Sequence, residues 1–312
     1  MAALRRSFER RCIDPQFHYL SVRQSQSWLA LHRLYSPFAA NPAGMEVYQS
    51  AFAWAAKNLP GDAVELVSLA CGGAGKEQQL TKCLRRAGKE VLVTLSDISV
   101  PLVLEGYQTL SAEPGVTDLE AVALDLLAAG DLNAILATGR SREISRVVTC
   151  FGLMPNTDPL VIAARLASLP AKNDVLLVGA NLVPESDYEQ NTRKALADYD
   201  NAATRHWLGL LLRDVGFEPE DGEMFFDVEP CASLPELLQI VAHFRLRRDR
   251  TIELGGEPLK FSAGEHLRLF FSNRYTPDLL RRVFELQKLK ILGEWVSVEK
   301  NEGIIACGAA GM

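Results

Sequence analysis

Between about Gly61 and Pro184, short runs rich in valine, leucine and isoleucine alternate with longer amphipathic segments. The apolar runs have the length and residue types of buried strands, and the segments between them have helical spacing. Strands that alternate with helices form βαβ units, whose strands lie parallel and are covered on both faces. The sequence therefore predicts an α/β fold with a parallel sheet. The last apolar runs before the C-terminus predict an antiparallel hairpin at the edge of that sheet.

The alternation stops after Pro184. Residues 186–276 begin with long helical segments and continue with strand-like runs that suit an antiparallel sheet. Residues 1–54 are predicted to be helical and are rich in aromatic side chains. We therefore predict a Rossmann-like core made of residues 55–185 and 277–312. Residues 1–54 and 186–276 are predicted to form a second unit of α+β type.

The composition limits the kinds of partner that the chain can have. It has 312 residues, a net charge of -6 and a pI of about 5.5, so it lacks the basic surface that nucleic acids and anionic membranes require. No apolar run approaches the length of a membrane span, and no apolar signal-peptide core follows the basic N-terminus. The six cysteines are scattered without close pairs, which argues against a zinc site or a disulfide framework. We expect a reduced, cytoplasmic protein, monomeric or homodimeric, with a small-molecule substrate and no metal.

The first predicted strand ends in "ACGGAGK", residues 70–76, where small residues replace side chains. In open α/β sheets, ligands bind outside the carboxyl ends of the strands, and a turn of small residues lets a ligand lie against backbone amides. Glu77 follows Lys76, so this is not a phosphate-binding loop with its terminal Gly-Lys-Ser/Thr. The three-glycine dinucleotide pattern is absent too. The turn therefore predicts a ligand other than a triphosphate or a dinucleotide.

Acidic residues follow the next two predicted strands. Asp97, at the end of the second, can accept hydrogen bonds from both hydroxyls of a ribose. Asp125, at the end of the third, is placed to contact an adenine edge. Each could instead cap a helix, which is a common use of aspartate after a strand. Together with the small turn, they favour the layout of class I S-adenosylmethionine (SAM) enzymes.

From about Phe17 to Gly308, the chain resembles the histidine-specific SAM-dependent N-methyltransferases of ergothioneine biosynthesis. The resemblance implies a class I methyltransferase core with an inserted substrate domain. The segments that carry it, in the order of the family, are "FHYLSVRQ", "LYSPF", "SLACGGAGKEQQL", "SDISVPLVL", "CFGLMPN", "DYDNAATRHWLGLLLRDVGFEPE", "FSAGEHLRLFFSNRY" and "EWVSVE".

The resemblance also implies roles for single residues. Tyr19 corresponds to a tyrosine near the transferred methyl group, and Asn156 to an asparagine that binds the amino or carboxylate group of the substrate. Tyr199 corresponds to a tyrosine that holds the substrate carboxylate. Without the resemblance, Tyr19 and Tyr35 would be core aromatics and Asn156 a turn residue. The expected substrate-binding residues are Tyr35, Phe270, Phe271 and Ser272, and the expected cofactor-binding residues are Ala70, Cys71, Gly72, Gly73, Lys76, Asp97, Asp125 and Phe151.

The chain departs from the family pattern at informative positions. Ala70 and Cys71 replace the first two residues of the usual Gly-Ser-Gly turn. Two positions before Ser272, the histidine-methylating enzymes carry a glutamate that holds the imidazole, and this chain has Phe270. A phenyl ring cannot accept that hydrogen bond. We therefore expect an N-methyltransferase for a small amino acid or amine that is not specific for histidine.

Other interpretations of the same sequence are open. An apolar pocket without the glutamate could let the amine of SAM attack its own aminocarboxypropyl arm. That cyclisation would need SAM alone and would yield azetidine-2-carboxylate and methylthioadenosine. A degenerate, non-enzymatic subunit is a third possibility. The joint retention of Lys76, Asp97, Asp125 and Asn156 argues against it.

Overall fold

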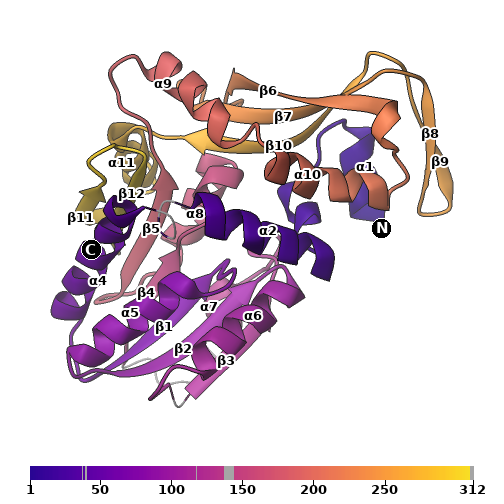
Figure 1. The fold of residues 1–312 in the computed structure, drawn as a ribbon. Coiled ribbons are helices and arrows are strands. Elements are labelled where there is room, and N and C mark those ends of the chain that lie inside the picture. The colour runs from indigo at the N-terminus through magenta and orange to yellow at the C-terminus, as the bar shows by residue number, and fades with distance from the viewer. Residues whose placement is uncertain (37, 39–40, 117, 137–143, 310–312) are drawn as a thin grey trace.

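The structure is a computed structural model that describes residues 1–36, 38, 41–116, 118–136 and 144–309 (Figure 1). Within these residues, a sheet of seven strands forms in the order β11-β12-β5-β4-β1-β2-β3. Strands β1 to β5 are parallel, and β12 and β11 are antiparallel to their neighbours. The strands are β1 (Ala63–Leu69), β2 (Glu90–Asp97), β3 (Asp118–Ala123), β4 (Ser145–Cys150), β5 (Val175–Asn181), β11 (Lys290–Val296) and β12 (Glu302–Gly308).

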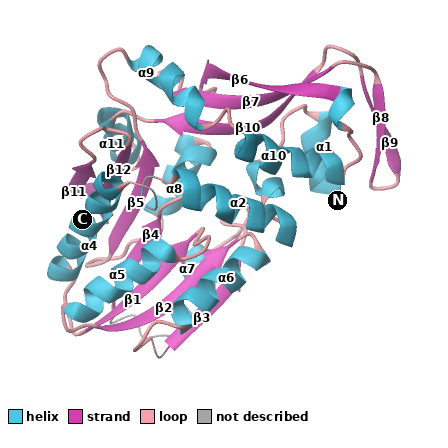
Figure 2. Ribbon diagram, viewed as in Figure 1, coloured by secondary structure: helices cyan, strands magenta, loops and turns pink. Residues whose placement is uncertain are grey.

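Helices cover both faces of this sheet (Figure 2). One apolar cluster joins α4 and α5 to one face, and another joins α7, α8 and α11 to the other face. Several of these helices begin where the sequence places a capping residue. Ser99 accepts a hydrogen bond from the backbone of Leu102 at the start of α6, with Pro101 in the first turn. The helices are α4 (Pro42–Asn58), α5 (Gly75–Arg86), α6 (Val100–Ser111), α7 (Leu132–Leu136), α8 (Pro159–Ala167) and α11 (Pro277–Glu285).

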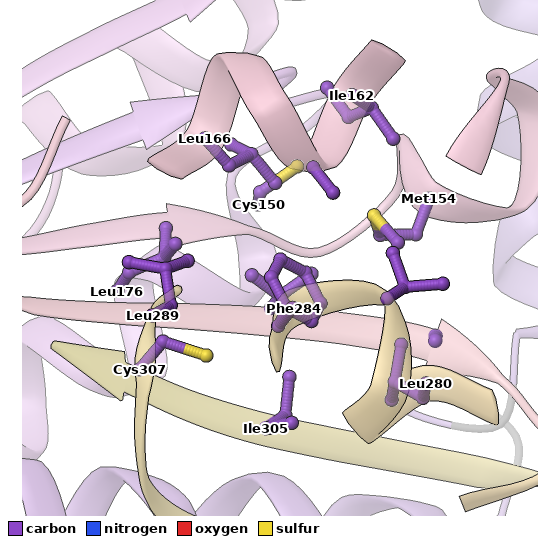
Figure 3. Close-up of a cluster of buried hydrophobic side chains, with 14 of the residues drawn as sticks. Cys150, Met154, Ile162, Leu166, Leu176, Leu280, Phe284, Leu289, Ile305 and Cys307 are labelled. Carbon is purple, nitrogen blue, oxygen red and sulfur yellow. The ribbon is translucent and has the colours of Figure 1, made fainter. Parts of the chain in front are cut away.

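Figure 3 shows the second cluster, in which the side chains of α8 and α11 meet over β4, β5 and β12. Phe284 of α11 is fully buried and lies among Ile162 and Leu166 of α8 and Ile305 of β12. Side chains of this kind dominate the stability of a core, and truncation of a buried phenylalanine to alanine costs about 3–5 kcal/mol. This cluster holds the hairpin of β11 and β12 against the parallel strands, as the sequence predicted.

A second layer lies over the carboxyl ends of the parallel strands (Figure 1). It contains an antiparallel sheet in the order β10-β7-β6, a hairpin of β8 and β9, and the helices packed on them. These strands are β6 (Gly222–Pro230), β7 (Leu238–Leu246), β8 (Arg250–Leu254), β9 (Glu257–Phe261) and β10 (His266–Arg274). The helices are α1 (Ala2–Glu9), α2 (Val22–Tyr35), α9 (Tyr188–Lys194) and α10 (Ala202–Asp214), with short 3-10 turns η1 (Pro15–His18), η3 (Ala195–Asp198) and η4 (Pro219–Asp221). A further 3-10 turn, η2 (Met154–Asn156), follows β4 of the large sheet and contacts β10.

Two details differ from the sequence-based expectation. Strand β3 ends at Ala123, so Asp125 lies in the following turn rather than on the strand. Helix α4 packs on the large sheet, because Tyr48, Phe52 and Ala55 belong to the apolar cluster on that face. The sequence assigned residues up to 54 to the second unit. We propose instead that the core begins with α4 and that the second unit consists of residues 1–41 and 186–276.

Candidate functional site

A cavity of about 490 Å³ lies between the large sheet and the second layer. This volume is typical of sites for small molecules. Most of the site residues expected from the sequence line it, although they come from distant segments. Those residues are Tyr19, Tyr35, Ala70, Cys71, Gly72, Gly73, Lys76, Phe151, Asn156, Tyr199, Phe270 and Ser272. Asp97, Asp125 and Phe271, which were also expected, are not among the side chains that line it.

The turn after β1 has a left-handed backbone at several positions, including Ala70 (φ 54°) and Gly72 (φ 53°). The sequence suggested that its small residues leave room for a ligand. The structure shows that α2 takes part of that room. A Cβ added to Gly72 would lie 3.0 Å from the ring of Trp28, and one added to Gly73 would lie 3.1 Å from Leu29. Of the three glycines in this turn, Gly75 is the one at which an added Cβ would meet no atom within 4 Å.

The carboxylate of Asp97 is nearly buried, with 7 % of the residue exposed. It accepts hydrogen bonds from the backbone N–H groups of Gly72 (3.0 Å) and Ser99 (2.9 Å). Burial raises the pKa of Asp97. The N-terminal segment covers this region, since Ser99 donates a hydrogen bond to the carbonyl of Tyr19 (2.6 Å) and its Oγ lies 3.0 Å from the Oγ of Ser25.

Asp125 holds its own turn. Its Oδ1 accepts hydrogen bonds from the backbone N–H groups of Leu127 (3.0 Å) and Ala128 (3.1 Å). This is the capping role that the sequence left open as an alternative. Contacts of Asp97 and Asp125 with a nucleoside therefore stay a prediction.

Lys76 enters the cavity beside a group that the sequence did not indicate. Its Nζ lies 4.6 Å from the ring centroid of Tyr48 and 3.3 Å from the carbonyl oxygen of Phe151. The hydroxyl of Tyr48 donates a hydrogen bond to Glu302, which also lines the cavity. Burial lowers the pKa of Lys76 and raises that of Glu302. No motif marks Tyr48 or Glu302, because Tyr48 lies in an apolar helix and Glu302 begins a strand directly after a charged stretch of sequence.

A polar cluster forms at the ends of β5 and β10. The Tyr199 hydroxyl and the Ser272 Oγ are 2.8 Å apart. The Nδ2 of Asn181 donates to Tyr199 (3.2 Å) and to Ser272 (3.4 Å). The guanidinium carbon of Arg274 lies 4.8 Å from the Tyr199 ring centroid. Tyr199 and Ser272 were expected to bind substrate, whereas Asn181 and Arg274 carried no sequence signal beyond their places at strand ends.

Aromatic side chains form a wall next to this cluster, since the rings of Tyr199 and Phe270 are stacked. The ring centroid of Trp207 lies 5.3 Å from that of Tyr19 and 5.5 Å from that of Phe270. Burial and the nearby Asp97 carboxylate raise the pKa of Tyr19, so its hydroxyl stays protonated at neutral pH. Tyr35 lies at the rim, with 48 % of the residue exposed.

The expectation that Phe271 lines the pocket together with Phe270 is not met. Adjacent residues of a strand point to opposite faces, and here Phe270 faces the cavity. The ring of Phe271 packs instead beneath the guanidinium of Arg268, 4.8 Å away.

Within the described parts of the chain, no group of three or more His, Cys, Asp or Glu side chains could hold a metal ion. Nor do these parts contain a helix long and apolar enough to span a membrane. Burial raises the pKa of Cys71 well above its ordinary value, so this thiol in the turn is not activated as a nucleophile. The groups of the cavity that can bind a ligand are therefore its polar cluster, its buried charges and its aromatic wall.

A family model described as histidine-specific methyltransferase, SAM-dependent, matches residues 45–308. The chain belongs to this family. The match spans all seven strands of the large sheet, the turn at 70–76 and the polar cluster around Tyr199 and Ser272. The protein is therefore a SAM-dependent methyltransferase, and its cofactor is SAM.

Solved structures of other methyltransferases are similar at low identity. Magnesium protoporphyrin IX methyltransferase of Synechocystis PCC 6803, with bound S-adenosylhomocysteine (SAH), is 14 % identical with a TM-score of 0.44, covering 91 % of this chain and 93 % of that one. The CcbJ methyltransferase of Streptomyces caelestis is 11 % identical with a TM-score of 0.43, covering 87 % and 98 %. Human N-acetylserotonin methyltransferase with SAM is 12 % identical with a TM-score of 0.43, covering 93 % and 57 %. These likenesses are too weak to add to the family match. No curated protein matches the chain.

The residues of this methyltransferase fit the amino-acid end of SAM. A Cβ added at Gly75 would meet no atom within 4 Å, and Lys76 and Glu302 line the same cavity with charges that complement a zwitterion. The nucleoside end would reach Asp97 only if α2 moved, because the segment from Tyr19 to Trp28 packs over both hydrogen-bond partners of that carboxylate.

Proposed function

We propose that this methyltransferase methylates the nitrogen of a small amino acid or amine other than histidine. The observation that carries the proposal is the position of Phe270. Its ring lies in the cavity wall between Trp207 and Tyr199, with centroid distances of 5.5 and 6.3 Å. In the histidine-methylating enzymes that the chain resembles, a glutamate at this position holds the imidazole. The loss of such a buried hydrogen bond costs about 1–3 kcal/mol, which is enough to remove much of a preference for histidine.

The polar cluster supports an acceptor with a charged end. Tyr199, Ser272 and Asn181 form one hydrogen-bonded group that presents hydroxyl and amide groups to the cavity. Asn156 lines the same cavity, from the loop after β4. We propose that Asn156 and Tyr199 hold the acceptor and that Ser272 positions the Tyr199 hydroxyl. These groups would fix the direction in which the acceptor nitrogen points.

The aromatic wall supports the chemistry. When bound, SAM supplies a methyl group that its sulfonium already activates. The chain then has to align the acceptor nitrogen, exclude water and favour positive charge. Trp207 and Phe270 are almost fully buried and leave little room for water at this wall. Aromatic faces, including that of Tyr19, attract cations, so they can stabilise a methylated ammonium.

The proposal is tested by product analysis. The purified full chain is incubated with SAM and, in separate reactions, with each of the twenty common L-amino acids and a set of simple primary amines. SAH and methylthioadenosine are then quantified by mass spectrometry. We expect SAH to form with at least one acceptor other than histidine, at a rate at least tenfold above that with histidine.

Two results would overturn the proposal. One is that histidine is the best acceptor. The other is that SAH forms with none of the compounds. The comparisons with known proteins do not support the cyclisation of SAM. That reaction would appear in the same assay as methylthioadenosine released from SAM alone.

A further inference from the structure

Two buried side chains of opposite charge line the cavity without a full set of partners. Glu302 is 3 % exposed and Arg274 is 6 % exposed. Among the described residues, the Oε2 of Glu302 and the Nε of Arg274 have no hydrogen-bond partner. No ion pair joins the two side chains in the described part of the structure. A buried charged atom without a hydrogen-bond partner is unfavourable, so a ligand that supplies the missing partner would be stabilised here. Burial raises the pKa of Glu302, although the charges of Lys76 and Arg274 favour its carboxylate form.

Both side chains are held in place from outside the cavity. Glu302 opens β12 directly opposite Asn181 at the end of β5, and the Tyr48 hydroxyl donates to its other carboxylate oxygen. Arg274 closes β10, and its backbone carbonyl accepts a hydrogen bond from the Tyr188 hydroxyl. The guanidinium of Arg274 lies over the Tyr199 ring. Glu302 is therefore held at the start of a strand and Arg274 at the end of one, and both residues line the cavity.

We propose that Glu302 and Arg274 recognise the two polar groups of an α-amino acid, with its amino group on Glu302 and its carboxylate on Arg274. Carboxylate and guanidinium groups are the side chains best suited to these partners, since charge-assisted hydrogen bonds are stronger than neutral ones. Tyr199, under the guanidinium, completes the carboxylate end. This inference rests on the proposed function and narrows its substrate from amines in general to α-amino acids.

Two different ligands could supply the amino and carboxylate groups that bind here. The acceptor would be an α-amino acid, and the methionyl end of SAM carries the same ammonium and carboxylate. Lys76 follows the turn after β1, whereas the guanidinium of Arg274 lies over Tyr199 of the polar cluster. The experiment therefore has one arm for each source.

The test is isothermal titration calorimetry of the full chain, as wild type, Glu302→Gln and Arg274→Met. In the first arm the ligands are SAH and methylthioadenosine, which lacks the amino-acid end. In the second arm the ligands are the twenty common L-amino acids, each added in the presence of saturating SAH. Glu299→Gln serves as the matched control, because this carboxylate is exposed in the turn that precedes β12.

We expect Glu302→Gln and Arg274→Met each to raise the dissociation constant of a ligand with an amino-acid end at least tenfold. The dissociation constant of methylthioadenosine should change less than twofold in these variants, and all dissociation constants should change less than twofold in Glu299→Gln. Weaker binding of SAH assigns the site to the cofactor, and weaker binding of an L-amino acid assigns it to the acceptor. The inference is overturned if the variants bind both SAH and the L-amino acids as tightly as the wild type does. It is also overturned if the binding of methylthioadenosine weakens as much as the binding of SAH.

The results distinguish a failure of charge recognition by Glu302 and Arg274 from a failure of the proposed methyltransferase function. If SAH binding depends on Glu302 but no acceptor is methylated, the charge recognition holds and the proposed function fails. If an acceptor is methylated at full rate by both variants, the proposed function holds and the recognition fails. Thermal unfolding of each variant shows whether it is folded. If Arg274→Met does not fold, the result with Glu302→Gln decides alone.

Discussion

The Nδ2 of Asn156 donates a hydrogen bond to the carbonyl oxygen of Phe271, 2.8 Å away. This bond ties the loop after β4 in the large sheet to β10 in the second layer. Asn156 lines the cavity as well, so a residue expected to hold the substrate also joins the two layers that enclose it. A change at Asn156 should therefore affect both stability and turnover.

We predict that Asn156→Ala lowers the free energy of unfolding by about 1–3 kcal/mol, because the Phe271 carbonyl loses its donor. Asn156→Asp should lose a similar amount, since a carboxylate cannot donate this bond. Urea denaturation measures the effect. Asn58→Ala, which removes an exposed hydrogen bond to the Trp54 carbonyl, should stay within about 0.5 kcal/mol of the wild type. Equal stability of Asn156→Ala and the wild type would show that the bond does not join the layers.

Helix α2 lies over the part of the turn that Asp97 supports. Because Trp28 packs against Gly72, we predict that Trp28→Ala weakens this closed arrangement and speeds the association of SAH several-fold. Stopped-flow fluorescence of the remaining tryptophans measures the rate. Trp54→Phe is the control, because the Trp54 ring packs beside Trp295 and does not line the cavity. An unchanged association rate in Trp28→Ala would mean that α2 does not restrict access.

Phe270 offers a direct test of specificity. We predict that Phe270→Gln raises the ratio of kcat/KM for histidine to that for the best other acceptor at least fivefold, because an amide can accept the imidazole hydrogen bond. The same change should lower the free energy of unfolding by about 2–5 kcal/mol, since it replaces a buried ring. Phe270→Leu keeps the site apolar and should leave the ratio unchanged. A fivefold rise in Phe270→Leu would refute the hydrogen-bond explanation.

His18 should make the stability depend on pH. It is fully buried, its Nε2 lies 2.7 Å from the Leu269 carbonyl oxygen, and burial lowers its pKa to about 4. The unfolded chain binds a proton on this group below about pH 6.5, so its contribution to stability is present above pH 6.5 and is lost as the pH falls toward 4.

We therefore predict that the wild type loses about 2 kcal/mol more stability than His18→Gln between pH 7 and pH 5. Burial raises the pKa of Glu302 and Asp97, and these groups contribute with the opposite sign, but they are present in both proteins and cancel in the difference. Denaturation of both proteins at pH 7 and at pH 5 measures this difference in stability. Parallel losses in the two proteins would show that His18 is not held neutral.

The sequence predicted the architecture well because the apolar periodicity of the strands is local. The end of β2 at Asp97 and the start of the helix after the turn follow from residues a few positions apart. The family resemblance placed Lys76, Asn156, Tyr199 and Ser272 in one site, and the structure brings them to one cavity.

Other parts of the site depend on contacts that no local pattern records. Glu302 becomes a cavity residue only because β12 pairs with β5, and Trp28 covers Gly72 only because α2 folds back onto the turn. For Asp125, the local sequence pattern was present but had two interpretations. Its acidic side chain after a strand suited both a ligand and a cap, and only the turn geometry distinguishes the two.

We propose that the cavity brings SAM and the amine of an α-amino acid together. Carbon-13 NMR tests this on the product formed from SAM labelled in its methyl group and the best acceptor of the amino-acid panel. We predict that the label resides on the α-nitrogen of the acceptor and that SAH forms in equal amount. A label on a side-chain atom or on oxygen, or release of labelled methylthioadenosine without transfer, would contradict it.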